Sequence, residues 1–408
     1  MRAQRSGTLL WLVAVLTCLA ALLGCGKTAP TPTPDPVTIS FAHPVKDGEF
    51  YGDALSAFSD EYPHITVQLQ PTSLGEFENI AQATKADTFV VYPQTQLAEL
   101  LENGTLLDLA PLIEQDDTFD LSDLYPSALE QCTIDGRRWA IPAGIDVVVL
   151  FYNQGLFDRS HVPHPEIGWT WAEFLHTAQA LRSLDDEVYA YLADPFLAVL
   201  AVYQHGGQIV DDLRHPTRTT FDDPLTIEAV QWYADLVQVH DVAPPPSTLL
   251  SPVEGWVDEK VAMMAMSFDQ RDETERVGWS GEWPAQWGMV PLPGDARSAT
   301  MALVEGYAIS AQAAHPEACW QWIAFLSEQV APASVPARRS IVESGAYREQ
   351  VGAQTADVVQ AILEDAQLVY LRDRELLQVF VGAVAQVLEG EATAAEAMQW
   401  AQERSPLR

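Results

Sequence analysis

The segment VTISFAHPVKDGEFYGDALSAFSDEYPHITVQL, residues 37–69, decides the fold class of this chain. Its first five residues alternate between apolar and polar side chains, which predicts a strand. Tyr51, Leu55 and Phe58 are spaced four and three residues apart, which predicts a helix over residues 50–62. Residues 65–69 repeat the strand pattern. Strand, helix and strand in this order are typical of a βαβ unit in a parallel sheet.

The same alternation continues along the chain. Residues 88–92 predict a third strand, and residues 145–152 predict a long apolar strand that is buried on both faces. The sequences TWAE at 170–173 and TAAE at 393–396 are capping boxes, which predict helix starts. Strand-rich and helix-rich segments follow one another twice. We therefore expect an α/β fold of two lobes, with the chain crossing between them more than once.

The N-terminal residues have the pattern of a secretion signal. Arg2 and Arg5 precede an apolar run over residues 9–23, and Gly24-Cys25 follows. The run is shorter than the roughly 20 residues that span a bilayer, which makes a transmembrane helix the weaker interpretation. A small residue before cysteine resembles a bacterial lipoprotein signal, in which Cys25 carries the lipid. We expect a signal peptide over residues 1–24 and a Pro/Thr tether over residues 25–36.

The composition limits the partners. The chain has 408 residues, 48% of them hydrophobic, and a formal net charge of −35. Such acidity repels phosphate backbones and argues against nucleic acid, but it suits either a solvated surface or a cationic ligand. Cys132 and Cys319 are the cysteines beyond the N-terminal segment. They could form a disulfide or remain as two buried thiols. No Cys or His cluster has metal-ligand spacing, so we expect no metal and no cofactor.

Short motifs occur in a characteristic order between residue 37 and about residue 340. They are DGRRWAIP at 135–142, YNQGLF at 152–157, TWAEF at 170–174, KVAM at 260–263, PLPG at 291–294, EGYAIS at 305–310 and PEACW at 316–320. Together they resemble the extracellular solute-binding proteins of ABC importers, the maltodextrin-binding and related sugar-binding group. Two positions depart from the pattern: Glu259 replaces a glycine, and Ala42-His43 stands where an aromatic residue is often found.

The resemblance implies a type II periplasmic-binding-protein-like fold with a hinge of several chain crossings. One lobe would comprise residues 37–145 and about 308–340, and the other residues 146–307 and about 341–408. It also implies a monomeric receptor outside the cytoplasm, lipid-anchored to a bacterial membrane. Such a receptor closes its lobes over a small polar solute, foremost a mono- or oligosaccharide, and delivers it to the permease subunits of an ABC transporter.

The resemblance also points to candidate ligand contacts at strand ends and lobe crossings. In sugar sites, aromatic rings cover the apolar faces and planar polar groups bond the hydroxyls. The candidates are His43, Glu49, Tyr92, Phe268, Asp269, Trp279, Trp283, Trp287, Glu305, Gly306, Tyr307 and Arg338, with Arg339 beside the last. Each has a structural alternative: aromatic residues can be core, His43 can bond the backbone, and the arginines can pair with surface acids.

Other functions stay open at this stage. A secreted glycoside hydrolase needs two carboxylates across a cleft. Because the chain has 57 acidic residues, the presence of such a pair cannot be judged from the sequence. No hydrolase nucleophile or zinc motif occurs, so we expect a binding protein rather than an enzyme. Within binding proteins, Glu305 and Asp269 beside aromatic residues would also suit a polyamine or another cation. Glycerol phosphate is less favoured, because only the two arginines offer an anion site.

Overall fold

The opening segment folds as its sequence pattern predicts. The computed structural model describes residues 35–72, 85–183, 188–248, 256, 258–271, 284, 286–330, 334–371 and 373–407. The first described elements are β1 (Val37–Pro44), α2 (Gly48–Glu61) and β2 (Ile65–Thr72). β1 and β2 are parallel, with Val37 opposite Ile65, which confirms the βαβ unit. β3 (Thr88–Val91) pairs in parallel with the other edge of β1.

Two long antiparallel strands connect the halves of the molecule. β6 (Ile141–Asn153) pairs with β10 (Ala299–Ile309), and the main sheet has the order β2-β1-β3-β10-β6-β8-β7. The strand predicted at 145–152 therefore begins four residues earlier, because its N-terminal half pairs with β10. The remaining strands are β4 (Thr133–Ile134), β5 (Arg137–Arg138), β7 (Tyr189–Tyr191), β8 (Val261–Ser267), β9 (Trp287–Val290), β11 (Val335–Pro336) and β12 (Gln367–Val369).

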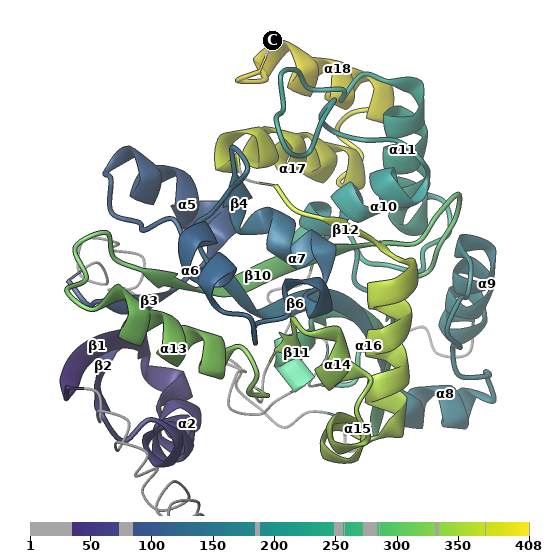
Figure 1. Ribbon diagram of the computed structural model, residues 1–408. Helices are drawn as coiled ribbons and strands as arrows, with labels where there is room; N and C mark the ends of the chain where they lie inside the picture. The colour runs from purple at the N-terminus through teal and green to yellow at the C-terminus, as the bar shows by residue number, and fades with distance from the viewer. Residues whose placement is uncertain are drawn as a thin grey trace, which may run out of the picture.

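Helices cover the two ends of the sheet (Figure 1). Those beside β1, β3 and the N-terminal half of β6 are α5 (Pro93–Glu102), α6 (Ala110–Gln115), α7 (Pro126–Gln131) and α13 (Pro316–Leu326). Those beside β7, β8 and β9 are α8 (Gln154–Ser160), α9 (Trp171–Arg182), α10 (Ala198–Gln204), α11 (Pro224–Gln238), α17 (Arg374–Leu388) and α18 (Ala394–Arg404). Three further helices are α14 (Arg339–Val342), α15 (Gly345–Val351) and α16 (Ala353–Asp365). Both predicted capping boxes form, at the starts of α9 and α18.

The buried apolar side chains form two clusters. The first lies around β1, β3, α2 and α13, and the second packs between α9, α10, α11 and α17. Successive residues of β6 point to opposite faces of the sheet, as the pleat of a strand requires. Val149 and Phe151 therefore join the first cluster, whereas Leu150 and Tyr152 join the second. The prediction that this strand is buried on both faces is confirmed.

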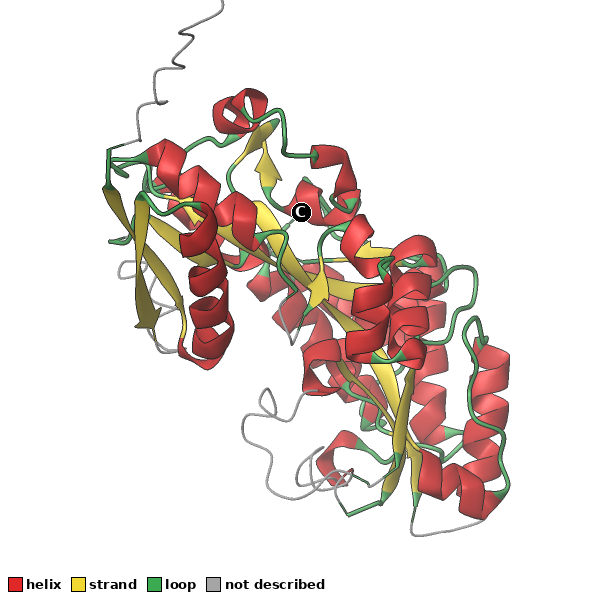
Figure 2. Cartoon of the chain, turned by 60° about the horizontal axis from the view of Figure 1, so that its bottom comes forward, coloured by secondary structure: helices red, strands yellow, loops and turns green. Residues whose placement is uncertain are grey.

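Three chain segments lie side by side between the two ends of the sheet. Gly144 of β6 is opposite Glu305 of β10 on one side and Pro336 of β11 on the other. Gly144 is confined to glycine, because a Cβ there would overlap the Ser334 side chain. Figure 2 shows the sheet running obliquely through the whole molecule, with helices on both sides. The expected repeated crossing of the chain is thus present at these three segments.

The two remaining cysteines are thiols. Cys132 and Cys319 are both free and buried, which settles the alternative that the sequence left open. Burial raises the pKa of the Cys319 thiol to about 12, so it is an inert apolar packing residue. Across the described ranges, no helix combines the length and apolarity needed to span a bilayer.

Candidate functional site

A polar cleft of about 150 Å³ lies where β6, β10 and β11 run side by side. On this measure one water occupies about 10–15 Å³, so the cleft has room for a small solute. Its walls come from η1 (Val45–Asp47), α2, α5, β6, η5 (Phe268–Arg271), β10 and the residue before β11. The lining residues are Lys46, Asp47, Phe50, Tyr51, Tyr92, Gln94, Asp146, Asp269, Leu303, Glu305 and Ser334.

The floor of the cleft is built by strand pairing. Asp146 of β6 is directly opposite Leu303 of β10, so both side chains point to the same face of the sheet. Glu305 follows two residues later in β10 and therefore shares that face. Leu303 keeps 38% of its surface exposed, which leaves an apolar patch between two carboxyl groups. A floor of this kind can contact both the hydroxyls and the apolar face of a small polar solute.

Asp146 is the carboxyl group with the most perturbed ionisation. The Ser267 hydroxyl donates a hydrogen bond to Asp146 Oδ2, and the Asp269 backbone N–H donates to Asp146 Oδ1 at 3.4 Å. Burial and the neighbouring Asp269 carboxylate nevertheless raise the pKa of Asp146 to about 7, although Lys46 acts in the opposite direction. Asp146 can therefore exchange a proton near neutral pH when the charge in the cleft changes.

Two buried tyrosines support the first wall of the cleft. The Tyr51 hydroxyl donates to Glu305 Oε1 at 3.4 Å, and its ring lies edge-on to Phe50, with centroids 5.0 Å apart. Burial raises the pKa of Tyr51 and that of Tyr307, whose rings are 6.5 Å apart. Both hydroxyls therefore remain protonated donors over the whole physiological range. Tyr51 therefore holds Glu305 as an acceptor at the wall of the cleft.

Tyr92 and Gln94 come from the start of α5. Tyr92 is the N-cap residue, and its own side chain makes no capping hydrogen bond. Its backbone N–H donates to Gln96 Oε1 at 2.8 Å. Gln94 lies in the first turn, is only 5% exposed, and its Oε1 has no hydrogen-bond partner among the described residues. Buried polar atoms are almost always paired in folded proteins. An orphaned acceptor at the wall of a cleft is therefore a candidate ligand contact.

The structure brings three of the predicted site residues together in this cleft. Tyr92, Asp269 and Glu305 line it. Phe268 and Tyr307 lie fully buried next to these lining residues, and a register shift in β10 falls between Glu305 and Gly306. The structure does not assign a ligand to any of them, so their roles stay predictions.

The other predicted site residues do not line this cleft. His43 is buried beneath it; its Nδ1 lies 2.8 Å from the Pro44 carbonyl oxygen, and burial lowers its pKa. Glu49 is exposed on α2, and Trp287 of β9 packs against Phe151 at 5.4 Å. The predicted residues Trp279 and Trp283, and the predicted lipidation site Cys25, lie outside the described residues.

The predicted arginines also lie elsewhere. Arg338 is 4% exposed, and its guanidinium donates to the Ser327 carbonyl and to the Asp123 carboxylate while lying over the Phe119 ring. Arg339 lies over the Tyr125 ring. The Asp123 contact of Arg338 matches the alternative given for these residues, pairing with acids, whereas the contact described for Arg339 is with an aromatic ring. A phosphate site at this position has no support in the geometry.

Sequence reasoning missed most of the residues that line the cleft. The missed residues Lys46, Asp47, Phe50 and Tyr51 come within seven residues after β1, in a segment from which only His43 and Glu49 were predicted. Asp146 had a usable signal, because it is the single charged residue inside the apolar run 145–152. The remaining lining residues, Gln94, Leu303 and Ser334, could not be predicted, because the residues next to them in the sequence give no indication that the three lie together at the cleft.

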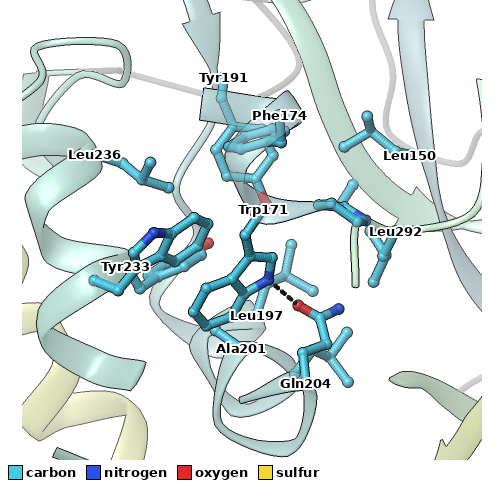
Figure 3. A pocket seen from close by; sticks show the side chains of 14 residues that line it. Leu150, Trp171, Phe174, Tyr191, Leu197, Ala201, Gln204, Tyr233, Leu236 and Leu292 are labelled. Atoms are coloured by element: carbon cyan, nitrogen blue, oxygen red, sulfur yellow. Dashed lines mark hydrogen bonds between the residues drawn. The ribbon is translucent and has the colours of Figure 1, made fainter. Parts of the chain in front are cut away.

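A second cavity, near the surface of α9, α10 and α11, has a different character (Figure 3). Its volume is about 30 Å³, enough for one or two waters. The Trp171 ring stacks on Trp232 at 3.7 Å, and Trp171 Nε1 donates to Gln204 Oε1 at 3.0 Å. Gln204 Nε2 in turn donates to the Ala299 carbonyl at 3.0 Å. These satisfied contacts mark a packed aromatic core.

Two α/β lobes that are joined by several strands and enclose a polar cleft define a solute-trapping binding protein. A model of the family described as bacterial extracellular solute-binding protein matches residues 43–331. The chain belongs to this family, as its motifs predicted.

Two solved structures and one curated sequence are among the proteins similar to this chain. The sugar-binding protein MalE of Xanthomonas citri is 20% identical over 90% of this chain and 96% of its own, with a TM-score of 0.76. An ABC substrate-binding protein of Listeria monocytogenes, solved with cycloalternan, is 22% identical over 91% and 98%, with a TM-score of 0.73. An uncharacterised ABC transporter extracellular-binding protein of Pyrococcus horikoshii is 21% identical over 78% and 75%. The predicted two-lobed type II fold is confirmed.

Proposed function

We propose that the protein is an extracytoplasmic receptor that captures a small polar solute by lobe closure and delivers it to an ABC permease. The observation that carries this proposal is the polar cleft at the crossing of β6, β10 and β11, in a chain of the solute-binding family. The lobes would comprise residues 37–145 with about 308–340, and residues 146–307 with about 341–408. Closure about the crossing strands would shift the population from open to closed once a solute bridges the two walls.

A mono- or oligosaccharide is the proposed solute class. The cleft offers aromatic rings from Phe50 and Tyr92, an exposed Leu303, and several carboxylates that accept hydrogen bonds from hydroxyls. The MalE of Xanthomonas citri is named as a sugar-binding protein, and the Listeria protein was solved with cycloalternan. A polyamine or another cation is the second candidate, and the specific observation that favours it is the concentration of carboxylates in the cleft.

Solution scattering and a binding titration test the proposal together. We expect a bound solute to reduce the radius of gyration and to change the tryptophan fluorescence of the purified protein. The panel comprises mono- and oligosaccharides, polyamines and glycerol phosphates. Glu305→Ala should weaken binding, whereas Asp60→Ala, which removes an acid from the exposed end of α2, should not. An unchanged radius at saturating solute would contradict closure.

Lipid anchoring through Cys25 is a separate part of the proposal. The sequence over residues 1–25 supports it, together with the extracellular assignment of the family. We expect the protein to fractionate with membranes and Cys25→Ala to release it or leave its signal uncleaved. Cys132→Ser is the matched control, because that cysteine is buried in the folded part. The related proteins serve transport, so we propose no catalytic role.

A further inference from the structure

The charged groups around the cleft are strongly unbalanced. Among the described residues that line it, the carboxyl groups are those of Asp47, Asp146, Asp269 and Glu305, and the one ammonium group is that of Lys46. Asp47 belongs to η1 on one side of the strand crossing, and Asp269 belongs to η5 on the other side. Asp146 and Glu305 lie on β6 and β10 at the crossing itself, so the acids surround the solute space. This surplus of negative charge lies inside the proposed binding site, not on the general surface.

Lobe closure makes the surplus unfavourable. Expelling water lowers the local dielectric and strengthens the repulsion between carboxylates that approach across the cleft. A neutral solute would leave that repulsion in place. A solute with a positive charge would offset it and would also satisfy the acceptors, because a protonated amine offers only donors. The rings of Phe50 and Tyr92 beside the acids add faces that attract a cation.

An independent observation comes from a neutral side chain. Gln94 lines the same cleft and is 5% exposed, and its buried Oε1 atom has no hydrogen-bond donor among the residues that the structure describes. A buried acceptor of this kind is expected to meet a donor when the site is filled. Gln94 therefore points to a donor-rich solute, in agreement with the carboxylates but on separate grounds.

We propose that the solute is an amino sugar or a closely related hydroxylated amine, whose protonated nitrogen lies among Asp146, Asp269 and Glu305. This inference rests on the proposed function, since it concerns the same cleft. The cleft volume of about 150 Å³ suits a body of monosaccharide size. The raised pKa of Asp146, caused by burial and by Asp269, is relieved when a cation arrives, so binding below pH 7 releases a proton. The groups that face Asp146 are Asp269, Ser267 and Lys46.

Calorimetric titration with three matched sugars at pH 6.5 tests the inference. D-Glucosamine, N-acetyl-D-glucosamine and D-glucose share a ring and differ at one position. Only glucosamine carries a positive charge there at this pH. We expect glucosamine to bind at least about tenfold more tightly than the other two, the effect of one charged hydrogen bond. Titration in buffers of different ionisation enthalpy should show proton release with glucosamine alone.

Variants connect that preference to the named residues. Asp269→Asn and Glu305→Gln should each abolish most of the preference for glucosamine. If one variant fails to fold, the other still tests the proposal. Asp60→Asn removes the same charge from an exposed position on α2 and should leave the preference intact. Equal or tighter binding of either neutral sugar would overturn this inference and leave the proposed function standing. Preference for spermidine, or no binding of any of the three sugars, would overturn it as well. Compaction with some other solute would then show whether the proposed function itself survives.

Discussion

Two glutamines show how differently the two cavities of this protein are built. Gln204 lies beside the Trp171 cavity, is 4% exposed, and uses both ends of its amide, one on Trp171 Nε1 and the other on the Ala299 carbonyl. Gln94 lies beside the cleft with nearly the same exposure, yet its Oε1 has no partner among the described residues. The two side chains are almost equally buried, but only the amide oxygen of Gln204 accepts a hydrogen bond from a described residue. Paired polar atoms mark a finished core, and the orphaned one beside the cleft is where we propose that a solute donates a hydrogen bond.

The largest expected effect is on the stability of the aromatic cavity. Trp171→Ala should lower the free energy of unfolding by about 3–5 kcal/mol, because it removes a buried ring that stacks on Trp232. Urea denaturation measures the loss. The same variant should bind solute with unchanged affinity under conditions where it is folded. A variant with full stability but weakened binding would break the comparison, since it would make the Trp171 cavity a ligand site.

Exchanging the two glutamines for leucine compares them directly. Gln204→Leu strands the Trp171 N–H and the Ala299 carbonyl, which should cost about 1–3 kcal/mol for each group left unpaired. Gln94→Leu removes an orphaned acceptor, so its stability should stay within about 1 kcal/mol of the original protein. Solute affinity should instead fall about three- to tenfold in Gln94→Leu alone. Equal stability losses in the two variants would show that Gln94 is as fully paired as Gln204.

The ionisation of Asp146 should make stability depend on pH. Its pKa is about 7 in the folded protein, above the ordinary value of an unfolded aspartate, because of burial and the Asp269 carboxylate. Between about pH 4 and pH 7 the folded state therefore binds more protons than the unfolded state. The free energy of unfolding should fall as pH rises through this window, by at most about 1.4 kcal/mol per pH unit.

Asp146→Asn checks the origin of that dependence. The variant should be more stable than the original protein at pH 8 and should flatten the stability profile between pH 4 and pH 7, measured by urea denaturation at several pH values. Lys46, Asp269 and Ser267 face the group and remain in place. If the pH profile of stability did not change in Asp146→Asn, other acids would cause the dependence. Asp146 would then be an ordinary residue whose charge is satisfied by its partners.

The smallest expected effect concerns the helix start that positions Trp171. The Thr170 side chain accepts from the Glu173 backbone N–H at the start of α9. Thr170→Ala should lower stability by about 1 kcal/mol without changing affinity. Thr393→Ala removes the equivalent capping box of α18 and is the matched control. The start of α5 is different, because Tyr92 is the N-cap there without a side-chain cap and lines the cleft. A loss of affinity in Thr170→Ala would indicate that the two regions are coupled.

The sequence predicted the architecture well where the signals were local. The alternation in residues 37–41 and 65–69, the apolar run at 145–152 and the two capping boxes each specify an element within a few neighbouring residues. The order of the family motifs added the two-lobed topology. The predicted site was less complete: Tyr92, Asp269 and Glu305 line the cleft, whereas His43 and Arg338 are engaged in the interior.

Local pattern alone therefore determined that this chain alternates strands and helices, buries a long central strand and carries the motifs of a solute-binding protein. Only the tertiary structure decided which polar groups meet. Antiparallel pairing of β6 with β10 places Asp146 opposite Leu303, and η1, α5 and η5 bring Asp47, Gln94 and Asp269 to the same space. The physical reason is range: secondary structure depends on contacts a few residues apart, whereas the cleft joins groups separated by hundreds of residues, and their burial, pairing and charge exist only after the chain has folded.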